Sequence, residues 1–213
     1  KVTPRRQAYR LSPSGDLSPP PGDTHSLHKS SARRRCPTIP AAVIKPQLIQ
    51  GGATMALRNI VTEKEARLRK VSRPVEKFDE RLWTLLDDMA DTMYEADGVG
   101  IAGVQVGVLR RVFVVDIGEG LTEFINPTIT AQSGEQDGLE GCLSSPGEYG
   151  LVVRPEKVTI EAYDRHGKPF TLDAEGFMAR AICHENDHLD GHIFKDITHH
   201  MLTDEELREL DEE

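Results

Sequence analysis

The charges and prolines of this 213-residue chain divide it into two parts near Gly51 and Gly52. Residues 1–54 carry nine basic and two acidic side chains, a formal charge of +7, whereas residues 55–213 carry 17 basic and 33 acidic side chains, a formal charge of -16. Eight of the 13 prolines also lie in the first part. With no helical or strand period and few large apolar residues, that part cannot offset the entropy of ordering and is expected to be disordered. Only the 159 residues from Met55 onward are therefore expected to build a folded domain.

Three explanations remain open for the basic tail, residues 1–54, which is rich in Pro, Ser and Arg. It is a leader or upstream extension with Met55 as the natural start, an organelle transit peptide, or an interaction tail whose Arg33-Arg34-Arg35 run touches nucleic acid. The prolines count against a transit peptide, which needs a short amphipathic helix. We assign the tail no function.

The overall balance of residues excludes several classes of protein. A formal net charge of -9 and a pI near 5.4 disfavour a dedicated DNA or anionic-membrane binder, because either needs a basic face. No apolar run approaches the roughly 20 residues of a membrane-spanning helix. Three scattered Cys are too few for a disulfide scaffold, which indicates a reducing compartment. We therefore expect an intracellular protein with neither DNA nor a membrane as partner.

From Met55 the hydrophobic pattern becomes that of a globular domain. Leucines and methionines at helical spacing predict a helix from Asp79 to about Gly98. A second helix is predicted from about Asp173 to Leu189. Four segments are predicted as strands, the second of them closed by its proline: 112–116, 123–127, 158–163 and 169–172. Strands followed by a long late helix indicate an α+β fold, with mixed or antiparallel sheets around a buried C-terminal helix.

The predicted second helix contains the metal-binding pattern His-Glu-x-x-His, formed by His184, Glu185 and His188. Residues four apart on a helix lie one above the other, so both imidazoles can bind one ion. Glu185 lies beside them and can take a proton from water. Phe177 and Ala181 share the face of the histidines. The polar residues are predicted to cover the rest of the helix: Arg180, Asn186, Asp187 and Asp190.

A catalytic metal needs a third ligand, and the common protease patterns do not supply one here. The long metzincin pattern would place a His at the position of Phe194. A thermolysin-like site would need a Glu on a following helix, but the chain after Leu202 reads as a short acidic tail. His192, His199 and His200 are expected to be exposed surface residues.

Cys142 is the candidate third ligand, because it lies between glycine-rich and proline-bounded turns in the run Glu140-Gly-Cys-Leu-Ser-Ser-Pro. A thiolate and two imidazoles leave a tetrahedral metal one open position for water. Cys183 directly precedes His184 and points about 100° away from it around the helix, so it is predicted to be a buried or semi-buried structural Cys. Cys36 lies in the tail and is excluded as a ligand.

A third element is the glycine-rich run Gly98-Val-Gly-Ile-Ala-Gly-Val-Gln105. No strand leads into it, no acidic ribose partner follows, and the Lys of a phosphate loop is missing, so it is not a nucleotide-binding fingerprint. Such a run is most often a bend. Its last residue, Gln105, could donate a hydrogen bond to a developing oxyanion.

Taken together, the three motifs resemble the peptide deformylase family of bacterial type. That family carries Gly-x-Gly-x-Ala-Ala-x-Gln, Glu-Gly-Cys-Leu-Ser and His-Glu-x-x-His-Leu, and all three occur here in that order between Met55 and Ile197. One departure is Gly103 in place of the second Ala, which would loosen the loop but leaves Gln105 in register. The resemblance implies that residues 55–213 form the catalytic domain of a monomeric, cytoplasmic bacterial enzyme.

The resemblance also implies the reaction, a hydrolysis that removes the formyl group from N-formyl-methionyl nascent peptides and releases formate. Cys142, His184 and His188 would hold one divalent metal, Fe²⁺ in the cell and Zn²⁺, Ni²⁺ or Co²⁺ in isolated samples. Glu185 would carry a proton from the attacking water to the leaving amine. The Gln105 side chain and the Leu143 backbone N–H would meet the oxyanion.

Substrate selection is expected to depend on a narrow apolar slot for the methionine side chain. Phe177 and Ala181 are placed to line it from the helix, with Val99 and Tyr149 opposite. The peptide backbone could add as a strand beside Gly100. Ordinary core packing explains Phe177 and Ala181 equally well, because pockets and cores use the same residue types.

Two other classes of protein remain open. A zincin-type metalloendopeptidase would share the helix but would not need Cys142. A structural metal domain would need a fourth ligand, for which Cys183 is the obvious thiol, and would leave Glu185 and Gln105 without a role. A transient ribosome contact is a further expectation, although the acidic segment 203–213 disfavours the basic helix that some relatives use for docking.

Overall fold

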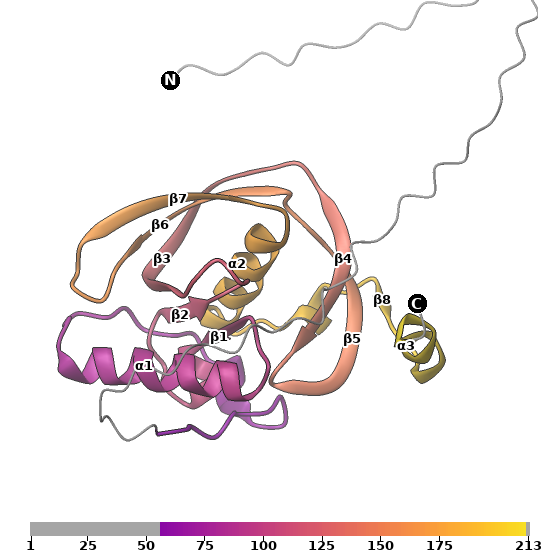
Figure 1. Cartoon of the computed structure of the whole chain (residues 1–213), viewed down its shortest axis with the longest axis horizontal. Helices are drawn as coiled ribbons and strands as arrows, with labels where there is room; N and C mark the ends of the chain where they lie inside the picture. The colour runs from indigo at the N-terminus through magenta and orange to yellow at the C-terminus, as the bar shows by residue number, and fades with distance from the viewer. Residues whose placement is uncertain (1–55, 212–213) are drawn as a thin grey trace, which may run out of the picture. The chain divides into compact units, whose positions relative to one another are not determined.

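The computed structural model describes residues 56–211, so the predictions for the tail 1–54 lie outside the described residues. Two antiparallel sheets enclose helix α2 (Gly176–Leu189), and helix α1 (Glu80–Glu95) covers the outer face of one sheet (Figure 1). The larger sheet has the order β1 (Gly100–Ala102), β2 (Val112–Val115), β3 (Thr122–Ser133), β6 (Lys157–Tyr163) and β7 (Pro169–Glu175). The smaller sheet has the order β4 (Gln136–Cys142), β5 (Ser145–Arg154) and β8 (His200–Met201). The predicted α+β class is confirmed, with both sheets antiparallel.

Helix α1 begins where the sequence predicts it. The Asp79 side chain accepts a hydrogen bond from the Leu82 N–H at 3.3 Å, which satisfies one of the N–H groups that the first turn leaves free. The helix ends at Glu95, with Ala96 as C-cap. Its apolar face is buried against the larger sheet by the predicted residues Leu82, Leu85, Leu86, Met89 and Met93.

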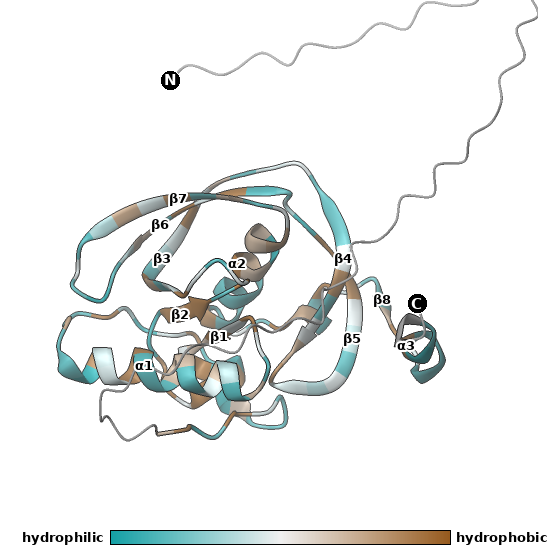
Figure 2. Cartoon of the chain, in the orientation of Figure 1, coloured by the Kyte–Doolittle hydropathy of each residue, from teal (hydrophilic) through white to brown (hydrophobic). Residues whose placement is uncertain are grey.

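Strand β2 forms the middle of a three-layer arrangement. Val112 and Val114 join the cluster under α1, whereas Phe113 and Val115 join the cluster under α2, because successive strand side chains point to opposite faces. All four are fully buried, and the strand is brown in Figure 2. The larger sheet is therefore packed between the two helices.

The smaller sheet is built on a hairpin in which only Leu143 and Ser144 connect β4 to β5. Cys142 pairs directly with Ser145 across this turn. Helix α2 lies between this hairpin and the larger sheet (Figure 1). The sequence did not predict the hairpin, because its strands mix glycines and charged residues without a period of two.

The predicted end of the second strand is wrong. Strand β3 passes through Pro127 and continues to Ser133. Its pairing with β6 shifts register between Ile125 and Thr128, and a bulge of this kind accommodates a proline that cannot donate to the ladder.

The predicted boundaries near the C-terminus also change. Helix α2 begins at Gly176 rather than near Asp173, because Asp173 pairs with Thr159 and accepts a 2.6 Å hydrogen bond from its hydroxyl. The segment after Leu202 is not a plain tail but forms α3 (Asp204–Asp211), which is mostly teal in Figure 2.

Three short 3-10 helices complete the described residues: η1 (Ala66–Arg69), η2 (Gly103–Val106) and η3 (Phe194–Asp196). The other C-terminal histidines are exposed as predicted: His192, His199 and His200. None of the helices between residues 56 and 211 has the length and apolar character that crossing a bilayer demands.

Candidate active site

Three metal-ligating side chains converge between the β4–β5 turn and α2. The Cys142 Sγ lies 3.2 Å from the His188 Nε2, although the two residues are 46 positions apart in the chain. Ligand atoms of Cys142, His184 and His188 all lie within 4.8 Å of one another. Both histidines are buried and Cys142 is half-buried. One thiolate and two imidazoles suit a transition metal and leave one tetrahedral position open, so these residues fit a catalytic divalent metal.

Glu140 orients His184. Its Oε2 lies 2.9 Å from the His184 Nδ1, which leaves the other ring nitrogen for the metal position. Arg154 donates to both carboxylate oxygens at 2.8 and 3.0 Å, and Arg180 donates to one of them at 2.9 Å. Burial opposes ionisation, but the hydrogen bonds from His184 and Arg154 lower the pKa of Glu140 to about 2. Glu140 is therefore a carboxylate at neutral pH.

Sequence reasoning missed this network and placed Arg180 wrongly. Instead of lying on the polar surface of the helix, Arg180 is buried and donates to backbone carbonyls of β4 and β5 as well as to Glu140. A signal for Glu140 was present, because it lies two positions before Cys142 and residues two apart on a strand share a face. The signal can be used only if β4 is first predicted as a strand, and the sequence did not predict it.

The two histidines have different electrostatic surroundings. Burial lowers the pKa of His188 well below its ordinary value, which keeps the imidazole in the neutral form that binds metals. Burial acts in the same direction on His184, but Cys142 and Glu140 outweigh it and raise the pKa. The Nδ1 of His188 is buried without a hydrogen-bond partner among residues 56–211. Phe194 stacks on His184 with ring centroids 6.2 Å apart and so restrains the plane of that ring.

Glu185 is buried against the backbone of Gly100. A Cβ added to Gly100 would come within 2.5 Å of the Glu185 Oε1, so only glycine permits this approach. Burial raises the pKa of Glu185 to about 7. Within the described part of the chain its Oε2 has no hydrogen-bond partner. A buried carboxyl with a pKa near neutrality can both accept and return a proton.

Gln105 lies beside the thiol. The Ala102 N–H donates to its Oε1 at 2.7 Å, and this bond orients the amide. Its Nε2 lies 3.5 Å from the Cys142 Sγ and 3.3 Å from the Ser144 Oγ. The run predicted as a bend is instead β1 followed by η2. Leu143, the other predicted oxyanion donor, lies in the turn directly after Cys142 and is partly buried.

Gly103 is closely packed. A Cβ at this position would lie 3.0 Å from the Val108 carbonyl oxygen and 3.1 Å from the Arg110 carbonyl oxygen. The backbone of the following loop thus fills the space that an alanine methyl would need. This packing replaces the looser loop that the sequence predicted.

The residues predicted to bind substrate differ in exposure. Gly100 and Ala181 are buried, whereas Val99, Tyr149 and Phe177 are 41%, 39% and 46% exposed. Large apolar side chains that stay accessible beside a buried polar cluster are typical of a binding surface. These three side chains are therefore accessible to a ligand.

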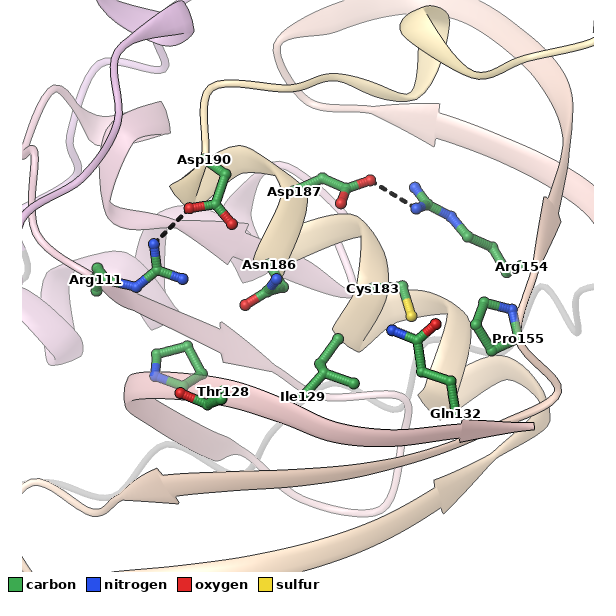
Figure 3. A pocket seen from close by; sticks show the side chains of 11 residues that line it. Arg111, Thr128, Ile129, Gln132, Arg154, Pro155, Cys183, Asn186, Asp187 and Asp190 are labelled. Carbon is green, nitrogen blue, oxygen red and sulfur yellow. Dashed lines mark hydrogen bonds and ion pairs between the residues drawn. The ribbon is translucent and has the colours of Figure 1, made fainter. Parts of the chain in front are cut away.

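A separate pocket of about 450 Å³ lies on the other side of α2 (Figure 3). Asp187 and Asp190 face it and pair with Arg154 and Arg111, each at 2.6 Å. Cys183 lines this pocket, is buried as predicted, and has its pKa raised to about 11 by burial. It does not belong to the ligand cluster found among residues 56–211, so the obvious fourth ligand of a purely structural metal domain points elsewhere.

Comparison with known proteins gives a consistent result. The sequence model of the family described as polypeptide deformylase matches residues 57–203. A peptide deformylase of Caldicellulosiruptor bescii is 54% identical over 155 residues, which are 73% of this chain and 93% of that protein. Peptide deformylase 1 of Bacillus subtilis is 47% identical over 159 residues, which are 74% of this chain and 99% of that protein.

Solved structures give the same result. The crystal structure of a peptide deformylase from Legionella pneumophila is 46% identical, with a TM-score of 0.65 and coverage of 74% of this chain and 95% of that chain. A class I type b peptide deformylase from Acinetobacter baumannii, solved with Met-Ala-Ser bound, is 32% identical, with a TM-score of 0.65 and coverage of 68% and 99%. The matched region contains all three motifs and the converging side chains, and the chain belongs to the polypeptide deformylase family of enzymes.

Proposed function

We propose that the protein is a metal-dependent hydrolase that removes the formyl group from the N-terminal formyl-methionine of nascent polypeptides and releases formate. One arrangement carries this function above all: the thiol of Cys142 lies beside both the His188 ring and the Gln105 amide. Family membership supports the reaction, and the A. baumannii relative was solved with a peptide that begins with methionine. Such substrates are made on ribosomes, so the enzyme would act in the bacterial cytoplasm.

Cys142, His184 and His188 would hold one divalent cation, Fe²⁺ in the cell by analogy with the family. When bound, that cation polarises the formyl carbonyl and acidifies the attacking water. Glu140 would act through His184, because its carboxylate fixes which ring nitrogen faces the cation.

Glu185 would move the proton. It takes one from the attacking water as the new C–O bond forms, and gives it to the amine nitrogen as the formyl C–N bond breaks. The products are formate and a peptide with a free amino terminus. The pKa of about 7 supports both halves of this cycle near neutral pH.

The Gln105 Nε2 and the Leu143 backbone N–H would donate to the oxygen that becomes negative in the transition state. The Gln105 amide is preoriented by its bond from Ala102, so little reorganisation is needed. Removing one such donor typically costs about 3 kcal/mol in the transition state. The exposed side chains of Val99, Tyr149 and Phe177 would contact the first residues of the peptide.

Replacing Glu185 by Gln is the most direct test, because the shape is kept while the proton acceptor is lost. We expect kcat for formyl-Met-Ala-Ser to fall at least about 100-fold, the usual contribution of a general acid–base group. The metal content should stay near one per chain. The matched control is Glu161→Gln, because Glu161 is exposed on β6 and should leave kcat unchanged.

Two outcomes would contradict this function. Unchanged turnover in Glu185→Gln would exclude its role as the proton carrier. Internal cleavage of casein without formate release would instead identify a metalloendopeptidase.

A further inference from the structure

Residues 61–63 connect two parts of the site. The Val61 N–H donates to the Gln105 carbonyl oxygen at 2.7 Å, and the Glu63 N–H donates to the Ser144 carbonyl oxygen at 3.0 Å. This segment therefore spans from the residue that carries the amide donor to the turn that follows Cys142.

The Glu63 side chain adds a charged link. Lys195 donates to both of its carboxylate oxygens, at 3.0 and 2.9 Å, and also pairs with Glu148. The Ser145 hydroxyl donates to the same carboxylate at 3.2 Å. The Lys195 and Glu63 side chains are only 20% and 30% exposed, so the pair is screened less than an ion pair at the open surface.

The other end of this link reaches the histidines. Lys195 lies in η3, directly after Phe194, which is 1% exposed and stacks on the His184 ring. The stacking of Phe194 thus holds the backbone of Lys195 close to His184, one of the candidate metal ligands. The Lys195 ammonium group reaches the turn after Cys142 through Glu63, which bonds Ser144 and Ser145.

We propose that Lys195 and Glu63 are positioning residues that hold the Cys142 turn at a fixed distance from the two histidines. The inference rests on the proposed function, in which Cys142 is a ligand. The smaller sheet needs such a link, because Val152 is its only fully buried hydrophobic residue among those described. A displacement of about 1 Å in such a turn is enough to impair a catalytic site.

The test uses Co²⁺-substituted full-length protein, whose thiolate-to-cobalt absorption band and rate of cobalt release to a chelator report on the site without substrate. In Lys195→Met we expect roughly tenfold faster cobalt release and a roughly tenfold lower kcat with formyl-Met-Ala-Ser, as for other changes just outside a metal's ligands. KM should change less than about twofold, because no group that contacts the peptide is removed. Lys195→Arg should restore both values.

Lys157→Met is the matched control. It breaks another Lys–Glu pair, with Glu175 at 2.7 Å, but that pair is exposed on β6 and β7. It should leave the absorption band, the release rate and kcat unchanged. Glu63→Gln is the milder second variant, since it keeps an acceptor for Ser145 while removing the charge, and it decides the question if Lys195→Met does not fold.

A lower melting temperature in Lys195→Met and Glu63→Gln, with the cobalt band, release rate and kcat of the parent protein, would overturn the inference and leave the pair a purely structural contact. If instead the proposed function were wrong, the experiment would give a different result. In that case the parent protein itself would release no formate, while the cobalt measurements would still report whether Lys195 holds the turn.

Discussion

The two sheets are held in place by different forces. The larger sheet contributes to both hydrophobic clusters, with Phe113 and Ile160 in the cluster under α2 and Val114 in the cluster under α1. The smaller sheet is tied to α2 through hydrogen bonds that Arg180 of α2 donates to β4 and β5 and through the bond from Arg154 of β5 to Asp187 of α2. Hydrophobic burial has no preferred direction, whereas hydrogen bonds to a planar guanidinium fix both distance and angle.

This difference matters because the candidate ligands are divided between the two parts. The histidines belong to a helix that packs on the larger sheet, and Cys142 belongs to the smaller sheet. A substitution in the hydrophobic clusters should lower the free energy of unfolding without altering the candidate active site. A substitution in the guanidinium network, the hydrogen bonds of Arg180 and Arg154, should alter both.

The largest effect is expected from Arg180→Met. The substitution removes one of the donors to the buried Glu140 carboxylate and takes the arginine donor from the carbonyls of Gln136, Gly138 and Val152. We expect the free energy of unfolding in urea to fall by about 4 kcal/mol and metal binding to be lost. Arg81→Met on the exposed side of α1 is the control. A loss below about 1 kcal/mol would mean that this network does not hold the smaller sheet.

Acid should weaken the same network. The pKa of Glu140 is lowered from 4.5 to about 2 on folding, so its contribution to stability is complete above about pH 4.5 and is lost as the pH falls toward 2. The difference amounts to roughly 3 kcal/mol, measurable by urea unfolding of metal-free protein between pH 6 and about 2. Glu140→Gln should be less stable at pH 6 and should lack this part of the acid dependence. Parallel curves for the two proteins would assign the acid sensitivity to other carboxyl groups.

The smallest effect is expected in the hydrophobic cluster. Ile160→Val removes one methylene from a fully buried side chain in β6 and should cost about 1 kcal/mol of unfolding free energy. The metal content and kcat should stay those of the parent protein. A changed kcat would show that the larger sheet also tunes the site, and the contrast between the sheets would fail.

Sequence periodicity predicted the larger sheet better than the smaller one. Helix α1 and strands β2 and β6 bury apolar residues, so their spacing follows 3.6 or 2 residues. Strands β4 and β5 bury the charged residues Glu140 and Arg154 instead, and no hydrophobic pattern marks them. The bulge at Pro127 was missed for a related reason, because a proline within a central strand normally argues against that strand.

The sequence motifs identified the candidate ligands and Glu185, but they did not identify the residues that hold these side chains in place. Glu140, Arg154 and Arg180 meet only after the β4–β5 hairpin has docked on α2. Lys195 and Glu63 lie 132 positions apart, and nothing in the local sequence links them. Long-range polar partners of this kind depend on the tertiary arrangement, which local spacing does not contain.

The contact between Gly100 and Glu185 bears on how the chain folds. Strand β1 has three residues and pairs Gly100 with Val115 of β2. A slip of one residue would put the side chain of Val99 or Ile101 where not even a methyl group fits, so α2 could not dock on the misaligned strand. A chain that pairs these strands wrongly therefore cannot close its site. During refolding, the recovered enzymatic activity would therefore report the fraction of molecules in which β1 and β2 have paired in the native register.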